Sequence, residues 1–209
     1  MTVTLQQMRG GMPQPSFFLL GVDLGQANDY TAIAILKQMG QPPKCVYHLV
    51  HLERPALRTT CPDIVRRVQT LMQTPELRDR CALVVDATGC GRPVVDMIRQ
   101  AGLRPIAVTI TGGNDVTSTG AGVGVPKRNL ASILQVMLQS ERLKVAQALP
   151  EAGTLVNELL NFRVKISVAG HDTYEAWREN AHDDTVLAVA IALWYGERRP
   201  TRRNRMYEY

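Results

Sequence analysis

The chain has 209 residues, enough for one domain with a sizeable buried core, and 45% of them are hydrophobic, which is ordinary for a globular protein. Its formal net charge is +5 and its sequence pI is about 9.2, a mild basic excess that only weakly favours a polyanionic partner. No apolar run approaches the roughly 20 residues of a membrane span, residues 1–15 lack a signal-peptide core, and the four cysteines and four histidines show no zinc-ligand spacing.

Three apolar segments near the N-terminus predict β-strands. Residues 17–22 form a continuous apolar run, as expected of a strand that is buried on both faces. Residues 31–36 and 45–52 predict a second and a third strand, and the glycine and prolines of residues 40–43 predict the turn between them. Because the connections are short, the three strands are expected to pair antiparallel.

The middle of the chain alternates between helical and strand patterns. Apolar residues at helical spacing follow Thr60 and predict a helix. Residues 83–86 then predict a buried strand, residues 93–100 a helix and residues 106–110 a further strand. This alternation predicts parallel pairing through right-handed crossover connections.

The C-terminal part of the chain predicts three more features. Residues 111–124 are rich in glycine, threonine and serine and predict a flexible loop, after which Pro126 is expected to open a helix. Apolar and polar residues alternate before a turn sequence within residues 161–172, which predicts a β-hairpin. Residues 184–195 predict a final apolar helix that Gly196 ends.

The order of these elements predicts the fold class. Three antiparallel strands followed by parallel strand–helix units are typical of the ribonuclease H-like arrangement. The expected architecture is therefore α/β, with a mixed five-stranded sheet of three antiparallel and two parallel strands, flanking helices, and an extra β-hairpin before the last helix. Residues 1–15 are expected to be a flexible leader, residues 16–197 the domain, and residues 198–209 a basic tail.

Four aspartates follow from this topology as candidate site residues. Asp23 ends the first predicted strand and Asp86 ends the fourth, and these two strands are expected to be parallel neighbours. Ligands in open α/β sheets bind outside such carboxyl ends. Asp183 and Asp184 begin the last predicted helix, which can pack across the same edge. The topology thus predicts one acidic site from three separate motifs.

Divalent cations are the expected cofactors of this site. Carboxylates in one crevice repel one another, and a bound cation keeps them ionised. Hard oxygen ligands select Mg²⁺ or Mn²⁺, and two such ions can promote phosphodiester cleavage. Simpler interpretations remain open: Asp23 as a turn residue, Asp86 as a helix cap, and Asp183 or Asp184 as an N-cap.

At these positions the sequence resembles the nuclease domain of the large terminase subunit of tailed bacteriophages. The resemblance covers about residues 16–196 and is carried by four short stretches in a specific order: Gly21-Val22-Asp23 with Asn28-Asp29-Tyr30-Thr31-Ala32, Val85-Asp86-Ala87-Thr88-Gly89-Cys90-Gly91, Val125-Pro126-Lys127-Arg128, and His182-Asp183-Asp184 with Ala188, Ala190 and Ala192. It implies a metal-dependent DNA endonuclease acting in genome packaging in the host cytoplasm. It also implies double-stranded DNA as substrate, and a packaging ATPase domain, the small terminase subunit and the portal as partners.

Four basic residues are predicted to contact DNA phosphates. Lys127 and Arg128 follow a glycine-rich loop at a predicted helix N-terminus, where backbone amides also favour phosphate. Arg163 and Lys165 share one face of the predicted hairpin. For both pairs an ordinary solvent-exposed surface is the alternative interpretation.

Three other functions are considered beside the packaging nuclease. A Holliday-junction resolvase uses several carboxylates and metal on this fold, and a non-enzymatic DNA-binding or scaffold domain would lack metal-dependent cleavage. An actin-like ATPase shares the core fold but needs two such domains. No Walker A motif is present, since Gly122-Val123-Gly124-Val125-Pro126-Lys127 has proline where glycine is required. Because full-length terminases also carry an N-terminal packaging ATPase, the chain is expected either to be an excised or separately encoded nuclease domain or to have another role.

Overall fold

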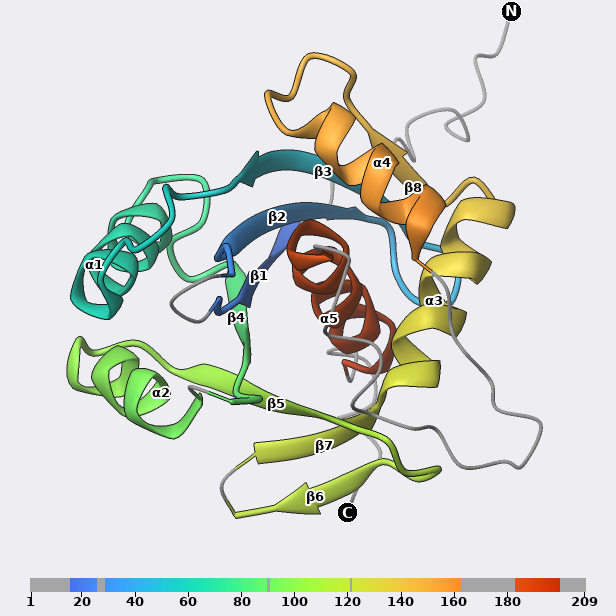
Figure 1. Cartoon of the computed structure of the whole chain (residues 1–209). Helices are drawn as coiled ribbons and strands as arrows, with labels where there is room; N and C mark the ends of the chain where they lie inside the picture. The colour runs from blue at the N-terminus through green and yellow to red at the C-terminus, as the bar shows by residue number, and fades with distance from the viewer. Residues whose placement is uncertain (1–15, 26–28, 90, 121, 163–182, 200–209) are drawn as a thin grey trace, which may run out of the picture.

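The computed structural model describes residues 16–25, 29–89, 91–120, 122–162 and 183–199. Within these ranges the chain forms an α/β fold around one mixed sheet (Figure 1). In chain order the strands are β1 (Phe17–Asp23), β2 (Ala32–Met39), β3 (Val46–Glu53), β4 (Cys81–Asp86), β5 (Pro105–Thr111), β6 (Thr117–Thr119), β7 (Gly122–Pro126) and β8 (Leu143–Val145). The helices are α1 (Cys61–Met72), α2 (Gly91–Gln100), α3 (Lys127–Gln139), α4 (Ala152–Asn161) and α5 (Asp184–Arg198).

The sheet contains eight strands among the described residues, in the order β6-β7-β5-β4-β1-β2-β3-β8. The first three strands pair antiparallel, as predicted. β4 joins β1 in parallel and β5 joins β4 in parallel, which confirms the five-stranded mixed core that the sequence predicted. Three further strands extend it at both ends: β7 and β6 beyond β5, and β8 beyond β3.

Helices cover both faces of the sheet and enclose two apolar clusters. On one face α1 and α2 pack over the sheet, with Ile64, Val68 and Ile98 in the buried cluster. On the other face α5 lies against the centre of the sheet with α3 and α4 beside it, as Figure 1 shows. Because α5 is buried along most of its length, its sequence is apolar on nearly all sides and has no wide polar face.

Close backbone packing holds α5 against β1. A Cβ atom at Gly21 would lie 2.0 Å from the backbone oxygen of Ala188 and 3.1 Å from the Cβ of Ala192. Glycine in the strand and alanines in the helix therefore let the two backbones approach directly. The contact places the N-terminus of α5 near the end of β1.

Two sequence predictions are wrong in the C-terminal half. Within residues 111–124, expected to be a loop, the chain forms β6 and the start of β7, because β5 supplies a parallel partner for a glycine-rich segment with low strand propensity. Gly196 does not end the last helix, which continues to Arg198. A Cβ at Gly196 would lie 2.5 Å from Leu19, so glycine serves close packing there.

The predicted β-hairpin lies mainly outside the described residues. Its first position, Asn161, ends helix α4, which the sequence did not predict, and Phe162 follows it. The leader at 1–15 and residues 200–209 of the basic tail also lie outside the description. Of the other tail residues, Arg198 is helical and Arg199 stacks on Phe17, with the guanidinium carbon 3.5 Å from the ring centroid.

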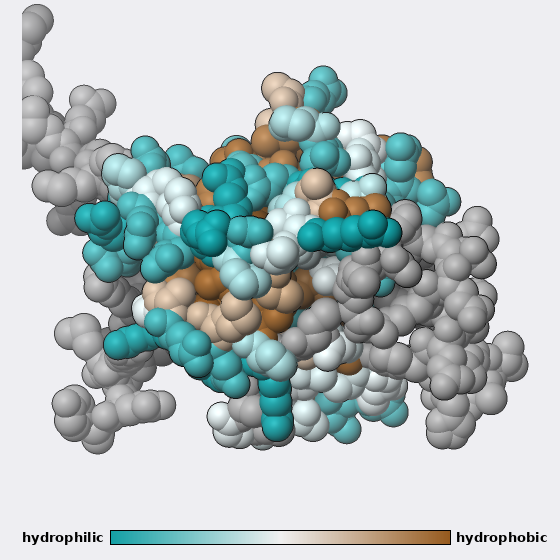
Figure 2. Space-filling model, turned by 60° about the vertical axis from the view of Figure 1, so that its left-hand side comes forward, coloured by the Kyte–Doolittle hydropathy of each residue, from teal (hydrophilic) through white to brown (hydrophobic). Residues whose placement is uncertain are grey.

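The surface around α1 and α2 is largely hydrophilic, with a hydrophobic patch in its centre (Figure 2). Among the described residues no helix is long and apolar enough to cross a membrane.

Candidate metal centre

Asp23 and Asp86 lie side by side at the carboxyl ends of two parallel strands. The register pairs Val22 of β1 with Val85 of β4, so the next residue of each strand is an aspartate. Only 7% of Asp23 and 5% of Asp86 are exposed. Their carboxyl groups are close enough to share a hydrogen bond, which one of them can donate only when protonated.

Helix α5 brings the other two predicted aspartates to the same place. Asp183 is the N-cap residue of α5 and Asp184 is its first helical residue, and Asp184 is only 6% exposed. The charges of Asp86, Asp184 and Asp183 all act on Asp23. The structure therefore groups all four predicted aspartates in one electrostatic neighbourhood.

Burial and mutual repulsion disfavour the charged forms of these groups. Burial is the main reason that the pKa of Asp23 is raised well above its usual range, and the other three aspartates raise it further. Burial also raises the pKa of Asp183 to about 7, although the Lys127 ammonium opposes this rise. The cluster can relieve its repulsion either by holding protons or by holding cations.

Hydrogen bonds do not assign the aspartates to simple capping roles. Asp86 Oδ1 accepts a bond from the Thr88 amide at 2.7 Å, three residues before α2 begins at Gly91, so Asp86 closes a local turn and does not cap the helix. Asp183 is in the N-cap position but its side chain makes no capping bond. Asp183 Oδ2 is buried and has no hydrogen-bond partner among the described residues.

Glu158 of α4 caps α5 instead. Its Oε2 accepts bonds from the backbone amides of Thr185, at 2.9 Å, and Val186, at 3.2 Å, and also from the Thr185 hydroxyl. Glu158 is 6% exposed, and its carboxylate, as the acceptor, satisfies these first amides of α5. A carboxylate from a second helix thus fixes the N-terminus of α5 and frees Asp183 from that role.

Arg54, immediately after β3, positions Asp184. Its Nη2 donates to Asp184 Oδ2 at 2.8 Å and lies 3.7 Å from Glu158 Oε1. The guanidinium also stacks on Tyr30, 3.9 Å from the ring centroid. Since the Arg54 side chain is only 15% exposed, these contacts hold one conformation of Asp184.

Sequence reasoning missed Arg54 and Glu158. Glu158 is three residues after buried Leu155 on one face of α4, so the available signal was a carboxylate on the apolar face of a helix. Because helix α4 was not predicted, Glu158 could not be recognised as a carboxylate on an apolar helix face. Arg54 shows no local pattern, because its partners are distant in sequence.

The predicted DNA-contacting residues are not all placed alike. Lys127, the first residue of α3, is directed towards the acidic site: its charge lowers the pKa of Asp183, and its Nζ lies 5.7 Å from the Phe162 ring centroid. Arg128 is exposed and donates to the Asn114 carbonyl at 2.7 Å. Arg163 and Lys165 lie outside the described residues.

The donor set fits hard divalent cations. The site offers carboxylate oxygens that are buried and mutually repelling, together with Asp183 Oδ2, which has no hydrogen-bond partner in the described part of the chain. Among the described residues no three His, Cys, Asp or Glu side chains already converge as a complete cation cage. Asp23 and Asp86 nevertheless lie within hydrogen-bond distance of each other, and the charges of Asp183 and Asp184 act on Asp23, so burial and mutual repulsion of these carboxylates support a cation site.

The raised pKa values predict that the metal-free protein loses stability as pH rises. Below pH of about 4 the Asp183 carboxyl is protonated in both states, but between that value and about 7 only the folded state keeps the proton. The unfolding free energy should therefore fall through this window, and Asp23 acts in the same direction.

Thermal melts in EDTA should show a melting temperature several degrees lower at pH 8 than at pH 5.5. Asp183→Asn should flatten this dependence, because the neutral amide has no proton to lose. Lys127, Asp184 and Glu158 also act on Asp183, so their charges set the midpoint. A melting temperature that rises over the same interval in the wild type and is unchanged by Asp183→Asn would contradict the burial of these charges.

Comparisons with known proteins are consistent with this geometry. Residues 20–195 match the family described as the terminase RNaseH-like domain. The large terminase nuclease from thermophilic phage G20c matches with a TM-score of 0.60 and 23% identity, over 85% of this chain and 81% of that one. No match was found among curated proteins.

Two further solved structures share the fold. The nuclease domain of the phage P22 large terminase has a TM-score of 0.55 at 16% identity, over 95% of this chain and 89% of that one. The Mn-soaked, inhibitor-bound terminase nuclease domain of human cytomegalovirus also has a TM-score of 0.55, at 12% identity, over 90% and 87% of the two chains. The ribonuclease H-like fold predicted from the order of elements is thereby confirmed.

Proposed function

This chain belongs to the terminase RNaseH-like domain family, and from that premise we propose that it is a metal-dependent DNA endonuclease that hydrolyses phosphodiester bonds. The observation that supports this most is the meeting of Asp23 and Asp86 at the carboxyl ends of β1 and β4, with Asp183 and Asp184 beside them. A family match alone would leave open whether the acidic residues of this chain come together.

Asp23, Asp86, Asp183 and Asp184 would hold two Mg²⁺ or Mn²⁺ ions. Carboxylate oxygens suit these cations, and one of the cytomegalovirus structures with the same fold was soaked in Mn. When bound, the ions supply charge stabilisation for the attacking and leaving oxygens and lower the pKa of bound water. Which of Asp183 and Asp184 is the principal ligand is part of the proposal that mutagenesis must decide.

The surrounding residues keep the carboxylates in place. The Thr88 amide fixes one oxygen of Asp86, and Arg54 fixes one oxygen of Asp184. Lys127 offsets part of the negative charge at Asp183. Because Glu158 already satisfies the first amides of α5, neither terminal aspartate is needed for capping.

The proposed substrate is double-stranded DNA, as in terminase cleavage of concatemeric viral DNA during packaging. The proposed partners are a packaging ATPase domain, a small terminase subunit and a portal, and the proposed location is the cytoplasm of a bacterial host. Phosphate contacts by Lys127, Arg128, Arg163 and Lys165 also remain proposals. For Lys127, proximity to Asp183 favours a role beside the scissile phosphate over one at a distant part of the duplex.

Incubation of supercoiled plasmid with the protein tests the proposed activity. We expect nicked and linear products with Mn²⁺ or Mg²⁺ and none in EDTA, because the carboxylates bind the reacting phosphate only through cations. Metal should also raise the melting temperature, since it binds the folded state preferentially.

Parallel reactions on a four-way junction and on linear duplex distinguish the related activities. Comparable cutting of both substrates supports a packaging nuclease, whereas a strong preference for the junction would support a resolvase instead. Cleavage that persists in excess EDTA would overturn the metal-dependent mechanism, and absence of cleavage with every metal would favour a DNA-binding or scaffold role.

A further inference from the structure

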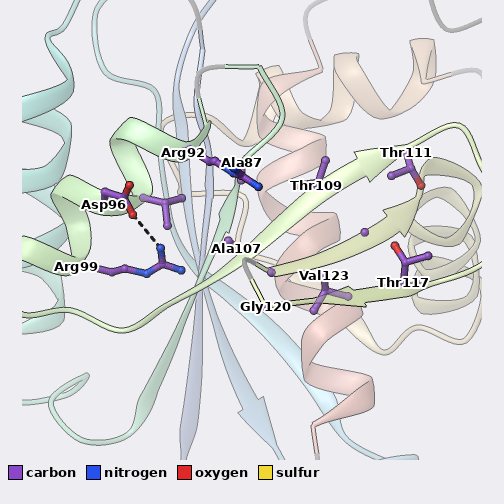
Figure 3. Close-up of a pocket in the computed structure, with 13 residues that line it drawn as sticks. Ala87, Arg92, Asp96, Arg99, Ala107, Thr109, Thr111, Thr117, Gly120 and Val123 are labelled. Carbon is purple, nitrogen blue, oxygen red and sulfur yellow. Dashed lines mark hydrogen bonds and ion pairs between the residues drawn. The ribbon is translucent and has the colours of Figure 1, made fainter.

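A hollow of about 710 Å³ lies on the sheet face that carries α2, and it reaches the carboxyl edge at which Asp86 ends β4. One wall is α2, and the floor is formed by β5, β7 and β6 (Figure 3). Ala87, the residue directly after Asp86, lines its upper end. Side chains alternate along β4, so Ala87 shares the α2 face with Val85, whereas Asp86 shares the α5 face with Val84. The hollow and the proposed metal centre are therefore connected around the carboxyl edge of the sheet.

Short side chains create this hollow. A Cβ at Gly124 would lie 2.3 Å from the Thr117 Oγ1 and 3.5 Å from the Thr111 Cγ2, so a larger residue would displace the neighbouring threonines. Thr109 and Thr111 of β5 and Thr117 of β6 also line the hollow (Figure 3). A glycine inside a strand with no side chain to pack often marks close approach by another backbone or a ligand. The floor thus offers hydroxyl groups and little steric obstruction.

Two arginines of α2 line the wall. Arg92 and Arg99 are seven residues apart, which places them on the same face of the helix, about 10 Å apart along its axis. Arg99 Nη1 pairs with Asp96 Oδ1 at 2.9 Å, but the two side chains are 47% and 60% exposed. An exposed pair of this kind contributes little to stability, so Arg99 can exchange Asp96 for a phosphate at small cost.

We propose that this hollow binds the phosphodiester backbone of the DNA strand that passes over the carboxyl edge of the sheet from the metal centre, with Arg92 and Arg99 contacting phosphates about three nucleotides apart. The roughly 10 Å between the two arginines spans about three backbone charges, at one charge per 3.4 Å of each strand. The threonine hydroxyls of the floor can donate to the phosphates along that path. The proposal rests on the proposed nuclease function and adds the path of its substrate.

The positions of the basic side chains that were predicted to contact DNA favour this path. Lys127 is directed towards Asp183, and the Arg128 guanidinium bonds the Asn114 carbonyl. Arg92 and Arg99 are exposed and line the hollow that reaches Ala87, the residue after Asp86. The open shape and the hydroxyl-lined floor fit an extended polar chain better than an apolar small molecule.

Binding of a fluorescent DNA duplex in EDTA tests whether the hollow contacts DNA, because no cleavage occurs without metal. Arg92→Ala and Arg99→Ala should each weaken binding by about tenfold, the loss of a charge-assisted hydrogen bond, on unrelated sequences alike. Each should also reduce the slope of log affinity against log salt by about one unit. In cleavage assays the loss should appear mainly in KM.

Arg66→Ala is the matched control. Arg66 of α1 also pairs with an aspartate three residues earlier, Asp63, at 2.7 Å, but it does not line the hollow. The Arg66→Ala variant loses one positive charge, as Arg92→Ala and Arg99→Ala do, but its salt slope should stay close to that of the wild type. Asp96→Asn should instead tighten binding, because it removes a negative charge from the wall and frees Arg99.

The proposal is overturned if the Arg92→Ala/Arg99→Ala double variant binds duplex DNA with the affinity and salt slope of Arg66→Ala. It is also overturned if the double variant binds RNA more weakly than the wild type but binds DNA equally well. Binding is measured in EDTA and does not depend on cleavage. If the wild type fails to cleave DNA, the nuclease proposal is therefore overturned, but the DNA-binding result for the hollow still stands.

Discussion

Asp23→Asn and Asp86→Asn are each expected to abolish metal-dependent cleavage while leaving the metal-free fold as stable as the wild type or more so. Asparagine keeps the shape of the side chain but cannot supply the negative charge that holds a cation. We expect a loss of about three orders of magnitude or more in kcat/KM, which corresponds to several kcal/mol of transition-state stabilisation. Stability is maintained because the buried carboxylates repel one another in the absence of metal.

The measurements are plasmid cleavage with Mn²⁺ and thermal melts in EDTA at pH 8. Metal should raise the melting temperature of the wild type much more than that of either variant. Asp115→Asn is the control, since Asp115 is exposed and outside the cluster. Variants that melt far below the wild type would assign the two aspartates to structural roles, and variants that retain cleavage would remove them from the site.

Gly21→Ala is expected to destabilise the fold and damage the site at the same time. The added Cβ would lie 2.0 Å from the Ala188 backbone oxygen, and a buried helix cannot move away without opening the core. Overpacking of this kind costs about 1–3 kcal/mol of unfolding free energy. Any retreat of α5 also displaces Asp183 and Asp184, so cleavage at a temperature where the variant is folded should fall well below the wild-type rate.

Gly153→Ala provides the matched control for this prediction. Gly153 lies in α4 with nothing within 4 Å of its Cβ position, so the same substitution should be neutral or stabilise by up to about 1 kcal/mol. Urea denaturation measures both free energies, and Mn²⁺-dependent cleavage reports the position of α5. Equal stabilities for the two variants would show that β1 and α5 do not pack as closely as described.

Local patterns in the sequence determined the core of the fold. The continuous apolar runs of β1 and β4 predict strands buried on both faces, and each run ends at an aspartate. Strand and helix order then determines that the two strands are parallel neighbours, since short connections favour antiparallel pairing and helical crossovers favour parallel pairing. Asp23 and Asp86 could therefore be placed together without coordinates.

Only the tertiary structure decided the elements whose stability comes from distant partners. β6, β7 and β8 are short or rich in glycine, and they become strands by pairing with β7, β5 and β3 respectively. α5 continues past Gly196 to Arg198, and Gly196 packs closely against Leu19, although the local sequence favours a helix terminus there. Pairing and packing across the sheet override local propensity in each case.

The residues that hold the acidic site in place also depend on partners that are distant in sequence. Arg54 is 130 residues from Asp184 in sequence, and Glu158 is 27 residues from the Thr185 amide that it caps. A charged side chain has no periodic signal, so its role depends on which opposite charge or amide the fold brings within hydrogen-bond distance. The sequence by itself determined which carboxylates end the central strands, and the tertiary structure decided which residues hold them in place, because contacts between buried polar groups depend on the packed positions of whole elements.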